Sequence, residues 1–172
     1  KSYNDLQKLL PMIDGIIFTS GYEPKLNLDD LTKDHALKMF NIHILGPMFL
    51  LKKLKEKLNE NSSIIFISSV AAFKGSYDPT YSAAKGAINS LTKTLAKDLA
   101  PKVRVNAIAP GLIYKSKVYN MMTPDFRKKH LKSSILNKYL TADECADAII
   151  FLLSNNHITG EILQLNGGQY FG

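Results

Sequence analysis

The stretch from residue 62 to residue 111 decides the fold of this chain. It begins with SSIIFISS, residues 62–69, and ends with VRVNAIAPG, residues 103–111. Both runs are short and apolar, and the first is rich in β-branched residues, which is typical of buried strands. Between them a helical pattern extends from Thr80 to Leu99 and stops before Pro101. The order strand, helix, strand predicts a βαβ unit with parallel strands.

The rest of the chain continues this alternation. The other predicted elements are a strand over residues 13–21, a helix over residues 31–59 with a kink at Gly46-Pro47, a partly helical basic segment over residues 121–139, a helix that begins with the capping box Thr141–Glu144, and a strand and turn over residues 161–168. The strands are apolar on both faces, so helices should cover both sides of the sheet. We therefore predict a single α/β domain, residues 1–172, with a doubly wound parallel sheet.

Composition excludes several classes of protein. The 172 residues are 45% hydrophobic, enough for one domain with a real core. The single cysteine, Cys145, forms no internal disulfide and favours a reducing cytoplasm. We expect no membrane span or signal peptide, since no apolar run is long enough. We also expect no metal site, since the four histidines lack the spacing of metal ligands. The net charge of +7 suits an anionic partner, but no nucleic-acid motif accompanies it.

The segment YSAAK, residues 81–85, is the first candidate for chemistry. Tyr81 and Lys85 are four residues apart, so they lie on one helix face, and the small residues between them allow a ligand to approach. A nearby cation favours phenolate, which makes the pair a candidate for proton transfer. Taken alone, such a pair is usually a solvated surface pair. Here, however, the strand before it ends in Ser68-Ser69, and ligands of parallel sheets bind at the carboxyl ends of strands.

Four segments together resemble the short-chain dehydrogenase/reductase family, including its 3-oxoacyl-acyl-carrier-protein reductases. They are IIFISSVAA, YSAAK, RVNAIAPG and ITGEILQLNGG, in this order and at close to the family's spacing. NIHILG, from Asn41, is similar to the family's asparagine-bearing helix segment. The resemblance implies a Rossmann-like fold and an oxidoreductase that uses NAD or NADP to interconvert a small-molecule carbonyl and an alcohol.

The resemblance also implies roles for individual residues. Tyr81 exchanges a proton with the reacting oxygen, and Lys85 lowers the pKa of Tyr81 and holds the nicotinamide ribose. Ser69 hydrogen-bonds the reacting oxygen, and Asn41 helps hold a water chain that resupplies the proton. The residues implied to contact the cofactor are Gly21, Tyr81, Lys85, Pro110, Gly111 and Ile113.

The chain also departs from the family pattern. It has no Gly-rich dinucleotide fingerprint and begins near the family's fourth strand, so we expect it to lack the first βαβ units, where the choice between NAD and NADP is made. Phe18-Thr19-Ser20-Gly21 replaces the family's Asn-Asn-Ala-Gly. Lys115 replaces a threonine that bonds the nicotinamide amide, and Ser116 is its candidate substitute.

The segment at about residues 114–139 corresponds to the family's substrate lid. Its basic residues are Lys115, Lys117, Arg127, Lys128, Lys129, Lys132 and Lys138, and only Asp125 opposes them. One interpretation is a solvated charged face, and the other is a lid for an anionic or carrier-bound substrate.

Two function hypotheses stay open at this point. The first is the NAD(P)-dependent enzyme, and the alternative is a catalytically silent binding or regulatory protein on the same scaffold. The helices predicted at residues 31–59 and 80–99 carry apolar residues beyond one buried stripe. We therefore expect a homodimer or homotetramer, with both helices in the interface.

Overall fold

A parallel sheet forms the centre of the molecule. The computed structural model of the chain describes residues 9–23 and 25–171. In this part the strands are β1 (Ile13–Phe18), β2 (Leu58–Ile67), β3 (Val103–Pro110) and β4 (Ile162–Leu165). They lie in the order β1-β2-β3-β4, and all three pairings are parallel. Each connection must therefore cross over a face of the sheet.

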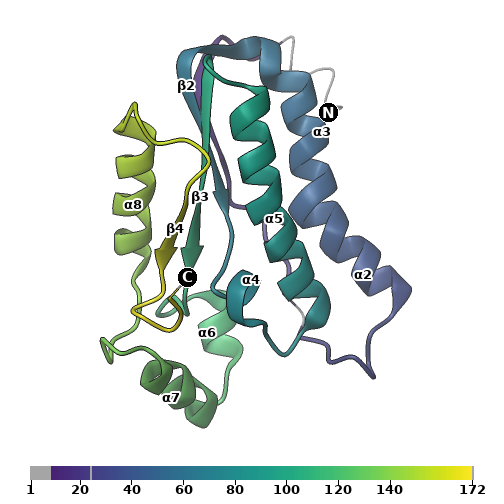
Figure 1. Cartoon of the computed structure of the whole chain (residues 1–172). Coiled ribbons are helices and arrows are strands. Elements are labelled where there is room, and N and C mark those ends of the chain that lie inside the picture. The colour runs from purple at the N-terminus through teal and green to yellow at the C-terminus, as the bar shows by residue number, and fades with distance from the viewer. Residues whose placement is uncertain (1–8, 24, 172) are drawn as a thin grey trace.

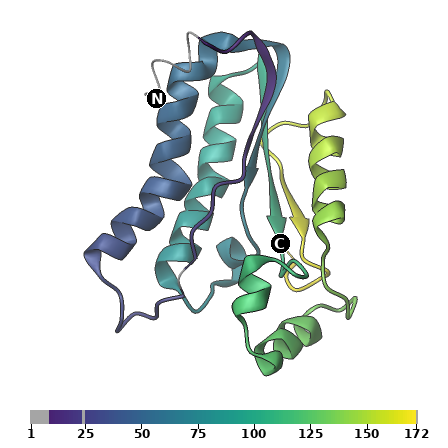
Figure 2. The same cartoon turned by 180° about the vertical axis from the view of Figure 1, so that it is seen from behind.

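Helices cover both faces of this sheet (Figures 1 and 2). On one face lie α2 (Lys33–Phe40), the π-helical turn η1 (Asn41–Leu45), α3 (Gly46–Leu54) and α5 (Pro79–Asp98). On the other face lies α8 (Ala142–Ser154). Along β2, Ile64 and Phe66 pack toward α3 and α5, whereas Ile65 packs toward α8. This period of two confirms the predicted doubly wound α/β fold.

Three short helices lie at the carboxyl end of the sheet (Figure 1). They are α4 (Ala71–Lys74), α6 (Lys117–Met121) and α7 (Pro124–Ser133). The last two replace the single basic segment expected from residue 121. Thr123 separates them, because its hydroxyl accepts a hydrogen bond from the backbone N–H of Phe126 and caps α7.

The predicted helix over residues 31–59 is wrong in its interior and at its end. The π-helical turn η1 interrupts it, and the backbone N–H of Gly46 donates to the carbonyl of Asn41. After α3 comes a short 3₁₀ turn, η2 (Lys55–Lys57), and β2 already begins at Leu58. The side chain of Leu58 is fully buried and its residue pairs with Ile13, so this part of the chain belongs to the sheet.

Caps fix the start of two other helices. Thr141 and Glu144 form the predicted capping box of α8, with the hydroxyl of Thr141 accepting from the N–H of Glu144 at 3.2 Å. Asp78 caps α5 by accepting from the backbone N–H groups of Thr80 and Tyr81 at 3.0 and 3.1 Å. This cap places Tyr81 in the first turn of α5.

Candidate active site

A cavity of about 520 Å³ opens at the carboxyl ends of β2 and β3. Parallel sheets bind ligands at this edge. The predicted site residues that line it are Ser69, Tyr81, Lys85, Pro110, Gly111 and Ile113. These residues come from the end of β2, the first turns of α5, and the end of β3 with the loop that follows it.

Tyr81 and Lys85 lie on the same wall of the cavity. Lys85 Nζ is 5.6 Å from the centroid of the Tyr81 ring and donates a hydrogen bond of 2.7 Å to the carbonyl oxygen of Ile67. Lys85 is only 4% exposed, although it carries a charge. A buried ammonium with one hydrogen bond to a carbonyl still has donors left for a ligand.

The pKa of Tyr81 is raised overall, although the sequence led us to expect Lys85 to lower it. Burial raises the pKa of the Tyr81 phenol, the carboxylate of Glu23 raises it further, and hydrogen bonding to Ser69 offsets part of this increase. Burial lowers the pKa of Lys85 to about 8, against the opposing effect of Glu23. At neutral pH Tyr81 therefore keeps its proton and Lys85 keeps its charge.

The two serines at the end of β2 have different surroundings. Ser69 lies by Tyr81 and affects its pKa, and its hydroxyl accepts from the N–H of Ala71 at 3.1 Å. Ser68 donates instead to the side chain of Asn89 on α5. The structure therefore places Ser69, rather than Ser68, beside the phenol.

Asn41 does not join this group. It is exposed and does not line the cavity. His43, two residues later in η1, is instead 2% exposed and packs edge-on to Tyr81, with ring centroids 5.9 Å apart. The π-helical turn changes the helical register, so His43 faces the site. Among sequence signals, only an imidazole within an apolar run pointed to it.

The imidazole of His43 is held by the loop after β1. Its Nε2 lies 2.9 Å from the carbonyl oxygen and 3.1 Å from the backbone nitrogen of Tyr22. Its Nδ1 is buried and has no hydrogen-bond partner in the described part of the chain. Burial and the neighbouring Lys85 lower the pKa of His43 to about 4, so the ring is neutral at physiological pH.

Other expected contacts fall outside the cavity. Gly21 does not line it, and a Cβ built on Gly21 would meet no atom within 4 Å. Lys115 does not line it either, but Ser116 does, and its hydroxyl caps α6 by accepting from the N–H of Tyr119. Sequence reasoning missed the titratable lining residues Glu23, Lys25, Lys74 and His130, which come from the loop after β1, from α4 and from α7.

Residues 9–23 and 25–171 contain neither a metal-binding cluster nor a membrane-spanning helix. No group of three or more His, Cys, Asp or Glu side chains there could hold a metal ion. No helix in this part of the chain is long and apolar enough to cross a bilayer.

Comparison with known proteins identifies the family. The sequence profile described as enoyl-(acyl carrier protein) reductase matches residues 1–169. The human 3-oxoacyl-[acyl-carrier-protein] reductase is 30% identical over 97% of this chain and 70% of its own length. The chain belongs to the short-chain dehydrogenase/reductase family.

Two solved structures support the same assignment. A short-chain dehydrogenase/reductase of Brucella melitensis, described as a glucose/ribitol dehydrogenase, superposes with a TM-score of 0.92 and 30% identity, covering 99% of this chain and 74% of that one. A small-chain dehydrogenase in complex with NADPH has a TM-score of 0.87 and 29% identity, covering 97% of this chain and 78% of that one.

Proposed function

We propose that the protein is an NAD(P)-dependent oxidoreductase that interconverts a carbonyl and a secondary alcohol, with Tyr81 as proton donor and acceptor. The observation that carries this proposal is the placement of Ser69, Tyr81 and Lys85 around one cavity at the carboxyl edge of a parallel sheet. The similarity to a reductase and to an NADPH complex supports it.

The residues of the cavity fit the nicotinamide half of the cofactor. One wall offers the Tyr81 hydroxyl and the Lys85 ammonium, which suit ribose hydroxyls, and the other offers Pro110, Gly111 and Ile113 to a flat ring. When bound, the nicotinamide supplies or accepts the hydride. The protein supplies position and the proton.

The proton steps follow from the charge states of the residues. In reduction, Tyr81 donates its proton to the carbonyl oxygen of the substrate. Ser69 orients that oxygen through a hydrogen bond. The charged Lys85 then stabilises the phenolate that is left. The neutral ring of His43 packs against Tyr81 and holds the phenol in place.

Several finer features belong to the same proposal. Residues 1–172 would be the C-terminal portion of a Rossmann domain of this family, and residues 114–139 its substrate lid, over an anionic or carrier-bound substrate. We place the protein in the cytoplasm. Burial raises the pKa of the Cys145 thiol to about 11, so the group is inert and suits a reducing compartment.

The alternative is a catalytically silent binding protein. Phe18, where the family pattern has asparagine, stacks on Phe66 with ring centroids 5.0 Å apart, so this position packs the core instead of offering an amide. Turnover decides between the two.

We expect the purified full-length protein to oxidise NADH or NADPH when a carbonyl compound is added. The measurement is the loss of nicotinamide absorbance with a panel of aldehydes and ketones, and a reaction without carbonyl is the control. Cofactor binding without carbonyl-dependent oxidation across the panel would favour the silent binding protein.

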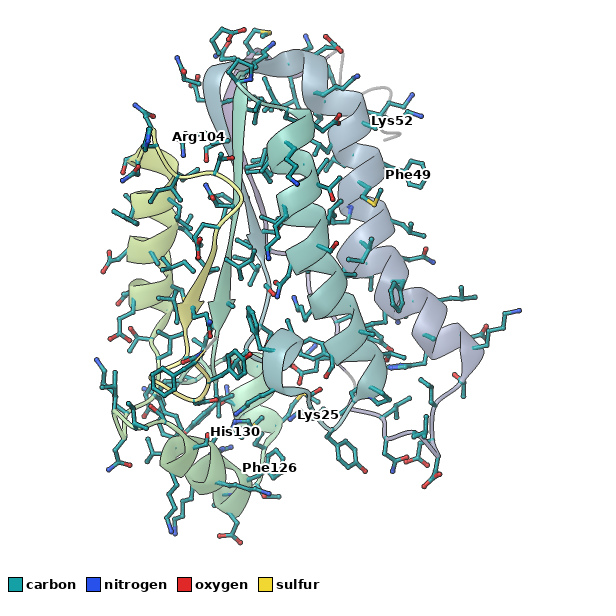
Figure 3. All side chains as sticks on the ribbon, in the orientation of Figure 1. Lys25, Phe49, Lys52, Arg104, Phe126 and His130 are labelled. Atoms are coloured by element: carbon teal, nitrogen blue, oxygen red, sulfur yellow. The ribbon has the colours of Figure 1, made fainter. Side chains whose placement is uncertain are left out.

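The exposed face formed by α3 and the end of η1 supports the proposed dimer or tetramer. Leu45, Met48 and Phe49 are 41%, 42% and 56% exposed, and Figure 3 shows Phe49 pointing away from the sheet. On α5, by contrast, Leu91 and Leu95 pack against the core. We therefore propose that α3 contributes more of the interface than the sequence pattern indicated, and α5 less.

Phe49→Glu is expected to reduce the mass in solution from that of a dimer or tetramer to that of a monomer. The substitution places a charge on an apolar face that we propose is buried between copies. Light scattering at micromolar concentration measures the mass, and Lys128→Glu, on the exposed side of α7, is the control. A wild-type protein that is monomeric at this concentration contradicts the proposal.

A further inference from the structure

Basic side chains from three separate segments line the mouth of the cavity. Lys25 follows β1, Lys74 ends α4, and Lys129 and His130 lie on α7. Figure 3 shows Lys25 and His130 at the same end of the molecule, with Phe126 beside them. We call these four residues the cationic rim. Lys129 and His130 lie within the basic segment recognised in the sequence, but only Lys129 was named there as a basic residue.

The rim lysines are not neutralised within the described residues. There, none of Lys25, Lys74 and Lys129 has a carboxylate oxygen within 4.0 Å of its Nζ. Lys74 donates to the neutral side chain of Gln169 at 3.1 Å. Burial lowers the pKa of His130, and Lys74, Lys25 and Lys129 lower it further, so all three lysines lie close enough to disfavour a charge on this imidazole. An anion bound among them would offset this concentration of positive charge.

The two carboxylates that line the cavity compensate the rim only in part. Asp78 is occupied as the cap of α5, accepts from the N–H of Leu26, and lies 3.3 Å from His35 Nε2. Burial raises the pKa of the Glu23 carboxyl, and Lys25 and Lys85 oppose this. Glu23 also raises the pKa of Tyr81, so it lies between Lys25 and Tyr81 and offsets the charge of only one rim lysine. The cavity therefore has a mixed inner end and a positive mouth.

Most other cations of residues 114–139 are occupied or point elsewhere. Arg127 donates to the carbonyl oxygens of Tyr119 and Asn120, and Lys138 pairs with Glu144 at 3.0 Å. Lys115, Lys117, Lys128 and Lys132 are exposed and do not line the cavity. For these residues the solvated-face interpretation fits better than a contact with substrate.

We propose that the cationic rim binds a carboxylate or phosphate group on the far end of the substrate whose carbonyl meets Tyr81. The inference rests on the proposed function for the carbonyl end and adds the chemical class of the substrate. Apolar side chains of Val118, Met122 and Phe126 line the same cavity. The substrate class is therefore an oxo compound with an apolar chain and an anionic end.

The test is a comparison of matched ligands by calorimetry. Levulinate and its longer straight-chain homologues are each paired with their methyl esters, and a ketoalkyl phosphate of similar length is a third arm. Oxidised cofactor is present, so no hydride is available and binding is measured without turnover. We expect at least one anion to bind about tenfold more tightly than its ester at low salt, a difference that about 0.5 M salt reduces.

Lys74→Met and Lys129→Met should each remove much of this preference, because methionine keeps the apolar stem and loses the charge. Lys128→Met is the matched control, since Lys128 is the neighbour of Lys129 on α7 and does not line the cavity. Lys129 is exposed, so its substitution leaves the core intact. The phosphate and carboxylate arms show which anion is preferred, and a preference for either supports the rim.

Equal affinities for acid and ester in every pair would overturn the rim as an anion site. So would a loss of preference in Lys128→Met as large as that in Lys129→Met, because it would indicate diffuse surface charge. Turnover with reduced cofactor is measured separately. Anion preference without turnover counts against the proposed function alone, whereas reduction of acid and ester with equal affinity counts against the rim alone.

Discussion

Tyr81→Phe is expected to lower kcat for carbonyl reduction by about 10²- to 10⁴-fold, with little change in KM. Positioned proton transfer contributes a factor of this order, which corresponds to about 3–5 kcal/mol of activation free energy. The phenol is the proposed proton donor, and burial and Glu23 both favour its protonated form. Phenylalanine keeps the ring contact with His43 and removes only the hydroxyl.

Steady-state kinetics of the two proteins with one carbonyl substrate measure this effect. Tyr114→Phe is the control, because Tyr114 belongs to an aromatic cluster with Tyr119 and Tyr139 and does not line the cavity. Its turnover should stay close to that of the wild type. If Tyr81→Phe also retains near-normal turnover, the proton comes from another group and the assigned mechanism is wrong.

The architecture was predictable because strand and helix periodicities are local properties. The apolar runs of β2 and β3 and the capping box at Thr141 depend on neighbouring residues, and the structure confirms both. The π-helical turn at Asn41–Leu45 was not predictable from periodicity, since one extra residue per turn leaves an apolar run looking like any helix. The early start of β2 was missed because Lys55–Asn59 lacks strand character by composition.

The candidate site was predictable only in part, for related reasons. Ser69, Tyr81 and Lys85 follow strand ends, so their meeting at one sheet edge follows from topology. His43 was missed because its orientation depends on the π-helical turn. Lys25 and Lys74 were missed because they reach the cavity from loops and short helices whose placement depends on tertiary packing. The net rise in the pKa of Tyr81 was missed because the sequence shows its neighbour Lys85 but not its burial or Glu23.

Lys85→Met is expected to reduce both turnover and cofactor affinity, because one ammonium stabilises the phenolate and holds the ribose in the proposed mechanism. Loss of a charged hydrogen bond costs about 1.5–3 kcal/mol, so affinity should fall about tenfold or more. Fluorescence titration with NADPH measures the affinity, and stopped-flow reduction measures the chemical step. Lys93→Met, on the exposed side of α5, is the control. Unchanged cofactor affinity would remove the ribose contact from the mechanism.

The pH dependence separates this role of Lys85 from a purely structural one. Burial lowers its pKa from 10.5 to about 8, so the ammonium loses its charge as the pH rises above about 8. Wild-type turnover should then fall over this range, and the low turnover of Lys85→Met should lack that step.

Stability should change in the opposite direction. Between about pH 8 and 10.5 the unfolded chain binds more protons than the folded one, so the wild type gains stability relative to Lys85→Met as the pH rises. Denaturant unfolding of both proteins across this range measures the difference in stability. A wild type that loses both turnover and relative stability above pH 8 would show that Lys85 serves the fold and not the reaction.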